Sequence, residues 1–131
     1  DILKFKQCSN LTYVGLCEQS QVSGYYRQSR YGLNYIAPEY PLTQQTSTKV
    51  IEYLVAGVPI ISNAYKWMEQ HASRHGYGYI NLADVLLGKL PSDGVNTTNL
   101  VLPYEKASMF TWDAILTECG FKDIIIKLVG R

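Results

Sequence analysis

The sequence lacks an excess of charge of either sign. Its 12 Lys and Arg and 11 Asp and Glu give a formal net charge of +1. This balance leaves no basic surface of the kind that binds nucleic acid and no acidic tail. Long apolar runs are missing too, since those at 60–61 and 124–126 are far too short to span a bilayer. No secretory signal pattern opens the sequence.

Cysteine is also scarce. Cys8, Cys17 and Cys119 are odd in number and do not have the spacing of a zinc site. A disulfide framework is therefore not expected, and three reduced thiols are. The expected location is the cytoplasm, with peripheral contact at the inner face of a membrane left open.

What the sequence does have is the composition of one folded domain. Its 131 residues are 47% hydrophobic and 18% charged, which suffices for a packed core, so a single domain over 1–131 is expected. Eleven tyrosines are many for this length. Tyrosine covers apolar surface and still offers a hydroxyl, so it suits either wet clefts or the edge of a core.

Strand and helix patterns alternate along the chain. Strands are predicted at 10–15, 31–36, 58–62 and 79–81, and helices at 20–30, 47–56, 63–74, 82–90, 104–109 and 112–119. Gly57 and Gly76 are expected to end the two central helices. The alternation predicts an α/β fold with a Rossmann-like open parallel sheet and helices on both faces. The unbroken apolar run at 58–62 predicts a strand buried on both faces. Because this sheet is thin, the chain is expected to be a piece of a larger protein.

The loop after the predicted strand 31–36 leads into the helix 47–56. Ligands of open parallel sheets bind at the carboxyl ends of strands, and a helix N-terminus attracts anions. The hydroxyls of Thr46, Ser47 and Thr48 and the charge of Lys49 lie at that point. Together they predict a phosphate or diphosphate site.

Glu52 follows Lys49 by three residues and therefore shares its helix face. A carboxylate there can accept hydrogen bonds from two neighbouring hydroxyls, as a ribose offers. A second interpretation stays open, in which Lys49 and Glu52 form a solvated ion pair on a capped helix.

The stretch 46–61 resembles the donor-site signature of GT-B glycosyltransferases. In that family small polar residues precede a lysine, and a Glu-Tyr pair, a glycine, a proline and an apolar strand follow. Here the pattern is carried by Lys49, Glu52, Tyr53, Gly57 and Pro59. The segments 11–15, 31–36, 76–78 and 110–112 are also similar to family segments, so the resemblance covers most of the chain from 11 to about 118.

The resemblance implies an enzyme of two Rossmann-like lobes, of which this chain is an incomplete C-terminal, donor-binding lobe. It implies that Thr46, Ser47, Thr48 and Lys49 hold the diphosphate of a nucleoside-diphosphate sugar, and that Glu52 holds the ribose. Lys49 and Glu52 are then the catalytic residues of this lobe. No metal is required by this scheme.

Two further positions follow from the resemblance. Backbone just after the glycine at position 15 meets the base in the family, which assigns a base contact to Leu16. Gln44 stands where many members carry a second glutamate, eight residues before Glu52. A glutamine can still bond a sugar hydroxyl but brings no charge.

The implied reaction transfers a sugar to an acceptor hydroxyl, in bacterial polysaccharide or glycoconjugate synthesis. A carbohydrate or lipid-linked acceptor would be bound by the other lobe, so this lobe alone is expected to be inactive. Three alternatives stay open: a non-catalytic nucleotide-sugar-binding partner of a transferase, which Gln44 favours; an epimerase; and a purely structural α/β domain.

Several other residues invite a functional role. His71 and His75 are four apart on a predicted helix, but the motif lacks the glutamate of a zinc-protease pattern, so surface or cleft-edge histidines are expected. Trp67 and Met68 are expected in the core. Residues 62–64 follow a strand and open a helix, which makes them a further candidate for contact with the donor.

Overall fold

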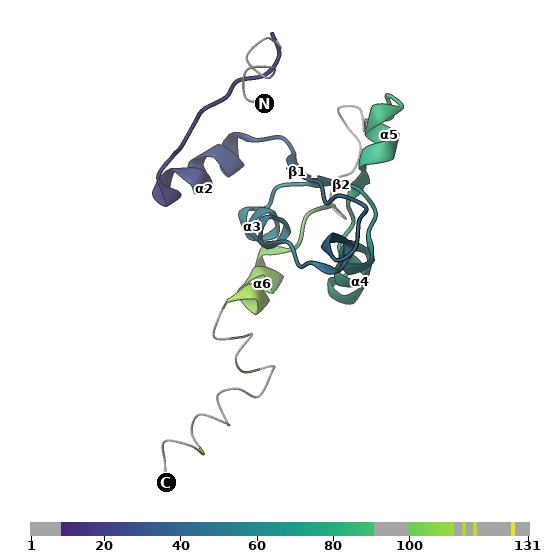
Figure 1. Cartoon of the computed structure of the whole chain (residues 1–131). Helices are drawn as coiled ribbons and strands as arrows, with labels where there is room; N and C mark the ends of the chain where they lie inside the picture. Colours follow the sequence, from purple (N-terminus) through teal and green to yellow (C-terminus); the bar gives the residue numbers. More distant parts are fainter. Residues whose placement is uncertain (1–8, 91–99, 112–113, 115–116, 118–126, 128–131) are drawn as a thin grey trace.

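The computed structural model describes residues 9–90, 100–111, 114, 117 and 127. It is an α/β structure built on a three-stranded parallel sheet (Figure 1). The strands are β1 (Gly32–Asn34), β2 (Ile60–Ser62) and β3 (Ile80–Asn81). The α-helices are α2 (Gln19–Gln28), α3 (Thr48–Ala56), α4 (Lys66–His75), α5 (Leu82–Leu86) and α6 (Tyr104–Ala107). Two short 3-10 helices are η1 (Leu42–Gln44) and η3 (Ser108–Phe110).

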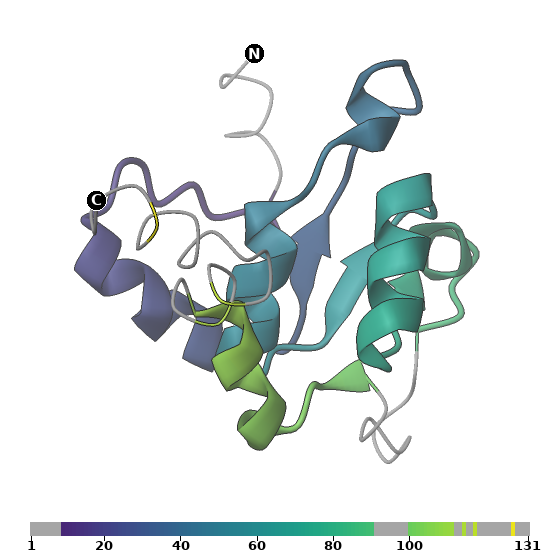
Figure 2. The ribbon, with the colours of Figure 1, turned by 90° about the horizontal axis from the view of Figure 1, so that it is seen from below.

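The strand order is β1-β2-β3, with all neighbours parallel. Helix α3 connects β1 to β2, and α4 connects β2 to β3. Parallel crossovers have the same, right-handed sense, so two successive steps in one direction place both helices on the same face of the sheet. Figures 1 and 2 show this arrangement, with α3 and α4 on one side of the strands.

The opposite face of the sheet is open over β1. Leu33 and Ile61 are in register on that face; Leu33 is 56% exposed and Ile61 is only partly buried. Among the described residues no helix covers β1 and β2 on that face, so helices on both faces are not seen there, and β2 is only partly buried on its second face. The physical reason is the strand order, since a helix on the second face requires a crossover in the other direction.

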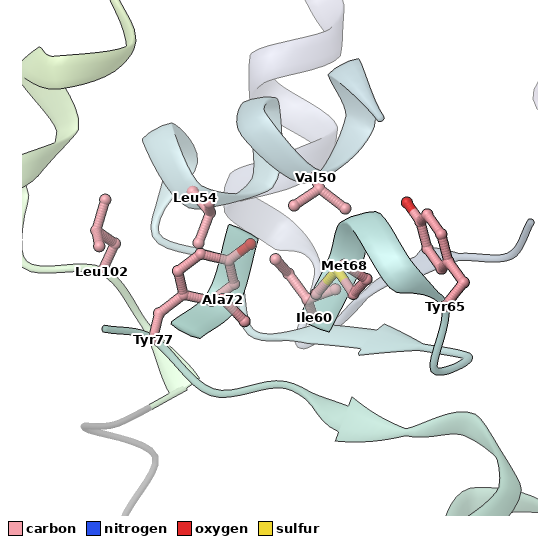
Figure 3. Close-up of a cluster of buried hydrophobic side chains, with 8 residues drawn as sticks. All are labelled: Val50, Leu54, Ile60, Tyr65, Met68, Ala72, Tyr77 and Leu102. Atoms are coloured by element: carbon pink, nitrogen blue, oxygen red, sulfur yellow. The ribbon is translucent and has the colours of Figure 1, made fainter. Parts of the chain in front are cut away.

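The core lies between the sheet and the two crossover helices (Figure 3). Val50 and Leu54 lie one helical turn apart on α3 and, together with Met68 of α4, pack over Ile60 of β2. Each such side chain contributes roughly 1.5–3 kcal/mol through burial. The remaining members of the cluster are Tyr65, Ala72, Tyr77 and Leu102. The predicted core position of Met68 is confirmed, and Trp67 packs partly buried against the cluster.

The ends of α3 and α4 follow their capping residues. Gly57 and Gly76 both adopt φ of 69°, a left-handed conformation that suits glycine, and they end the two helices as predicted. Ser47 caps the start of α3. The start of α4 differs from the prediction, because Tyr65 takes the N-cap position and Asn63 is used elsewhere.

The predicted strand at 10–15 is wrong. Residues 11–18 have no regular secondary structure and are exposed, so β1 is an edge strand of the described sheet. Helix α2 begins after Glu18, whose backbone N–H donates to the side chain of Gln21. No residue of α2 is buried.

The predicted helix 82–90 ends early, at Leu86, and both Leu86 and Leu87 are exposed. The predicted helix 104–109 is present as α6 followed by η3. Most of 112–119 lies outside the described residues, as do Cys8 and Cys119, while Cys17 is an exposed free thiol. Within the described ranges, no helix is long and apolar enough to cross a membrane.

Candidate functional site

Polar residues end β1 and β2 at their carboxyl ends. Asn34 ends β1 and Ser62 ends β2, and their exposed fractions are 2% and 0%. Ser47, at the start of α3, is 6% exposed. The carboxyl ends of parallel strands meet at one edge of a sheet, where ligands of such folds bind. The structure therefore brings three buried polar side chains to that edge.

These side chains form one hydrogen-bonded unit with Tyr65, and we call the four residues the polar frame. The Ser47 hydroxyl donates to Asn34 Oδ1 at 2.8 Å, and Asn34 Nδ2 donates to Ser62 Oγ at 2.9 Å. Asn34 Nδ2 also lies 3.5 Å from the Tyr65 hydroxyl oxygen. Among the described residues, no buried side-chain nitrogen or oxygen lacks a partner. The start of α3 is thereby tied to the ends of both strands.

Asn63 extends the sheet by one more pair. Its Oδ1 accepts from the Ile36 N–H at 3.0 Å, and its Nδ2 donates to the Ile36 carbonyl at 2.8 Å. The side-chain amide thus pairs with backbone as a neighbouring strand would. The expected helix cap at Asn63 is replaced by this link between the chain after β1 and the chain after β2.

The start of α3 offers free backbone donors. Ser47 Oγ accepts from the Val50 N–H at 3.4 Å, and the first intrahelical bond runs from the Ile51 N–H to the Ser47 carbonyl. The N–H groups of Thr48 and Lys49 precede these bonds and have no intrahelical partner. Both side chains are exposed, as is that of Thr46. Three of the four predicted diphosphate residues are therefore accessible, whereas the Ser47 hydroxyl is occupied by the helix cap and Asn34.

Glu52 is exposed one turn further along α3. Its Oε2 accepts a hydrogen bond from the Tyr26 hydroxyl of α2 at 2.6 Å. In the described part of the chain no ion pair joins Lys49 to Glu52, so the alternative of a solvated surface pair between them is not formed here. Burial first, and the bond to Glu52 second, raise the pKa of Tyr26, which keeps its hydroxyl a donor.

The Tyr26 ring packs against a second tyrosine, Tyr53. The two rings meet edge-on, with centroids 5.1 Å apart. The Tyr53 hydroxyl donates to the Leu33 carbonyl at 3.3 Å. The Tyr53 ring also lies directly over Gly32, where an added Cβ would come within 2.6 Å of it. A line of contacts therefore runs from β1 to the Glu52 carboxylate.

A groove of about 600 Å³ separates α2 from α3. The residues that line it include apolar residues of both helices, together with Tyr26, Glu52 and Arg27. The apolar lining includes Val22, Ile51 and Val55. A space of this size is within the range of small-molecule sites. Of the α3 residues that line the groove, only Ile51 lies nearer the helix start than Glu52.

The two remaining predicted site residues lie apart from this arrangement. Gln44 ends η1 and is exposed, three residues before the α3 cap. Leu16 is fully exposed in the irregular segment before α2, so the structure does not bring it against Glu52 or the start of α3.

His71 is part of an aromatic stack instead of a surface position. Its ring lies 4.5 Å from that of Trp67 and 5.6 Å from that of Phe110, and its Nδ1 is 2.7 Å from the Tyr77 hydroxyl. Burial, helped by the nearby charges of His75 and Arg74, lowers the pKa of His71 to about 4. The described residues contain no group of three or more potential metal ligands of the His, Cys, Asp or Glu type. We conclude that His71 is a neutral packing residue.

Comparisons with protein-family models, with curated proteins and with solved structures gave no match.

The geometry also includes residues that the sequence analysis did not single out. Asn34 could have been noticed as a polar residue inside an expected strand, next to the candidate segment. Tyr26 carries no local signal, because its partner Glu52 is 26 residues away.

Proposed function

We propose that this chain is the nucleotide-sugar-binding lobe of a GT-B-type glycosyltransferase and binds a nucleoside-diphosphate sugar at the start of α3. The observation that carries the proposal is the position of that helix start. It lies at the carboxyl edge of the parallel sheet, with the free N–H groups of Thr48 and Lys49, an exposed lysine side chain and the carboxylate of Glu52 one turn away.

This arrangement suits a leaving group that gains negative charge. When the sugar departs from its diphosphate, charge develops on the phosphate oxygens. Helix-end N–H groups and the Lys49 ammonium are fixed donors for that charge, and such preorganised donors lower the barrier to transfer. The polar frame supports this role, because it fixes the helix start against both strands.

The proposed position of the ribose follows from the spacing of Lys49 and Glu52 along α3. An α-helix rises about 1.5 Å per residue, so Glu52 lies roughly 5 Å along the axis from Lys49. The same order of distance separates a 5′-phosphate from the ribose hydroxyls of a nucleotide. Glu52 can therefore accept from those hydroxyls while Thr46, Thr48 and Lys49 hold the diphosphate. An acceptor and any general base would come from outside this chain.

The test is a thermal unfolding assay of the 131-residue chain with UDP, GDP, ADP and CDP and their common sugar conjugates. A ligand that binds only the folded state raises Tm by mass action. We expect one nucleotide to raise Tm by several degrees at saturating concentration, and Lys49→Ala and Glu52→Ala each to remove most of the rise.

Matched controls are Lys106→Ala on α6 and Glu69→Ala on α4, which remove the same charges from exposed positions away from the start of α3. Both should keep the ligand-induced rise. If no nucleotide raises the Tm of the wild-type chain even at millimolar concentration, the proposal is wrong for this chain. Binding without sugar transfer by the full-length protein would favour the non-catalytic partner instead.

A further inference from the structure

The strongest contact at the candidate ribose site comes from outside α3. The Tyr26 hydroxyl donates to Glu52 Oε2 at 2.6 Å, within the range for a hydroxyl bound to a carboxylate. Nothing in the proposed function assigns a role to Tyr26. Both residues line the groove between α2 and α3.

An exposed glutamate is a poor ligand-binding group by itself. Its side chain has three rotatable bonds, and fixing it on binding costs free energy through lost rotamers. Glu52 is exposed on α3, with no ion pair to Lys49. A hydrogen bond that holds one carboxylate oxygen before the ligand arrives removes part of this cost.

Tyr26 can supply such a bond because it is itself restrained. The edge-on contact with Tyr53 fixes its ring, and Tyr53 is fixed by its bond to the Leu33 carbonyl and by its close approach to Gly32. The Glu52 carboxylate is thus connected to strand β1 through Tyr26 and Tyr53. Oε1 of Glu52 has no hydrogen bond to a described residue and is left to accept from a ligand.

We propose that Tyr26 is a positioning residue, which holds Oε2 of Glu52 so that the carboxylate is preset to accept a ribose hydroxyl. This inference rests on the proposed function, since it needs a ribonucleotide beside Glu52. It adds a specificity role, because the preset carboxylate favours a ribose over a deoxyribose at the sugar position it contacts.

The experiment is a comparison of Tyr26→Phe with the wild-type chain by isothermal titration calorimetry. The probes are the tightest-binding of UDP, GDP, ADP and CDP and the 2′-deoxy and 3′-deoxy forms of that nucleotide. We expect Tyr26→Phe to weaken binding of the ribonucleotide about three- to tenfold. Binding of the deoxy form that lacks the contacted hydroxyl should be unchanged, so the ratio of ribo to deoxy affinity falls.

Two variants serve as controls. Tyr25→Phe makes the same chemical change at the neighbouring position of α2, where the tyrosine is exposed, and should leave the ratio unchanged. Glu52→Gln should lower the ratio, and adding Tyr26→Phe to it should have no further effect.

Several outcomes would overturn the inference while the proposed function stands. One is an equal loss for ribo and deoxy nucleotides in Tyr26→Phe, which indicates a general structural effect. Another is unchanged binding. A third is tighter binding, which would mean that the Tyr26 hydroxyl competes with the ribose for Glu52. If the wild-type chain binds none of the nucleotides, the proposed function fails and the inference falls with it.

Discussion

The polar frame and the contact between α2 and α3 use the same kind of bond in opposite surroundings. In the frame, Asn34, Ser47 and Ser62 are at most 6% exposed and every buried polar atom is paired. In the α2–α3 contact, a short bond joins two groups near solvent, and α2 contributes no buried residue. Buried networks are costly to break because their members lose water, whereas exposed bonds exchange with water at little cost. The start of α3 is therefore held by a buried network whose loss costs much stability, and Glu52 is held by a bond near solvent whose loss costs little.

Both regions depend on the three residues of β1. Asn34 belongs to the frame, while Gly32 and the Leu33 carbonyl receive the Tyr53 side chain. The polar frame and the α2–α3 contact are therefore both anchored on one short strand. Substitutions in β1 can therefore separate them.

The largest effect is expected for Asn34→Leu. Leucine has a similar volume but leaves the Ser47 hydroxyl without its acceptor and removes the amide donor from the Ser62 and Tyr65 hydroxyl oxygens, while Ser62 keeps its bond to the Asn63 carbonyl. Unpaired buried polar groups cost about 1–3 kcal/mol each, so the free energy of unfolding should fall by about 3 kcal/mol or more. Urea denaturation measures this change.

A control for Asn34→Leu is Asn81→Ala, which removes the exposed cap bond that the Ala83 N–H donates to Asn81 Oδ1. Its cost should be about 1 kcal/mol. Equal losses for the two variants would contradict the distinction between buried and exposed bonds.

The next largest effect is expected for Gly32→Ala. The new methyl group would meet the Tyr53 ring at 2.6 Å, so the ring must move and its contact with Tyr26 must loosen. Overpacking of this kind costs about 1–3 kcal/mol, measurable by thermal or urea denaturation. Nucleotide affinity should fall as well.

Gly24→Ala in α2 is the matched control for Gly32→Ala. Nothing lies within 4 Å of the Cβ position, and alanine favours a helix over glycine by about 0.5–1 kcal/mol. This variant should be slightly more stable than the wild-type chain. If Gly24→Ala lost as much stability as Gly32→Ala, the contact with Tyr53 would not explain the effect at Gly32.

Acid should destabilise the frame side of the molecule through His71. His71 stacks on Trp67, which stacks on Tyr65 of the frame. Its pKa is lowered to about 4, against about 6.5 when unfolded. As pH falls from 6.5 to 4 the unfolded state therefore binds the proton first, and the free energy of unfolding decreases across that window.

Urea denaturation at pH 7, 6, 5 and 4.5 tests this expectation. His71→Phe keeps a ring in the stack but cannot titrate, so its stability should change less with pH than that of the wild-type chain. Parallel pH curves for the two proteins would show that His71 is not responsible.

The smallest effect on stability is expected for Tyr26→Phe. The lost bond is near solvent, so the free energy of unfolding should fall by less than about 1 kcal/mol. The same variant is expected to change ribonucleotide affinity, so stability and binding should separate at this position. A loss of 3 kcal/mol or more by urea denaturation would place Tyr26 in the same class as the polar frame.

Local patterns in the sequence predict the central part of the fold well. The helix start at Ser47, the two glycine ends and the parallel sheet depend on caps and periodicity within a few residues, and these are confirmed. The predicted strand at 10–15 is wrong because strand formation needs a partner, and composition alone does not supply one. The open face of the sheet follows from strand order, which local periodicity does not determine.

The candidate site divides in the same way. Thr46, Thr48, Lys49 and Glu52 lie within seven residues, so helix geometry alone could bring them together. The contacts that hold them come from residues far along the chain. Asn34 and Tyr26 are separated by 13 and 26 residues from their partners Ser47 and Glu52. Such pairs depend on tertiary packing and leave no mark in local sequence.

The Ile36–Asn63 pair has a mechanical consequence. Two bonds from one side-chain amide join the chain that leaves β1 to the chain that leaves β2. A single hydrogen bond acts as a hinge, whereas two bonds to the same peptide unit resist rotation. We therefore expect the two segments at the carboxyl edge of the sheet to move together at this point.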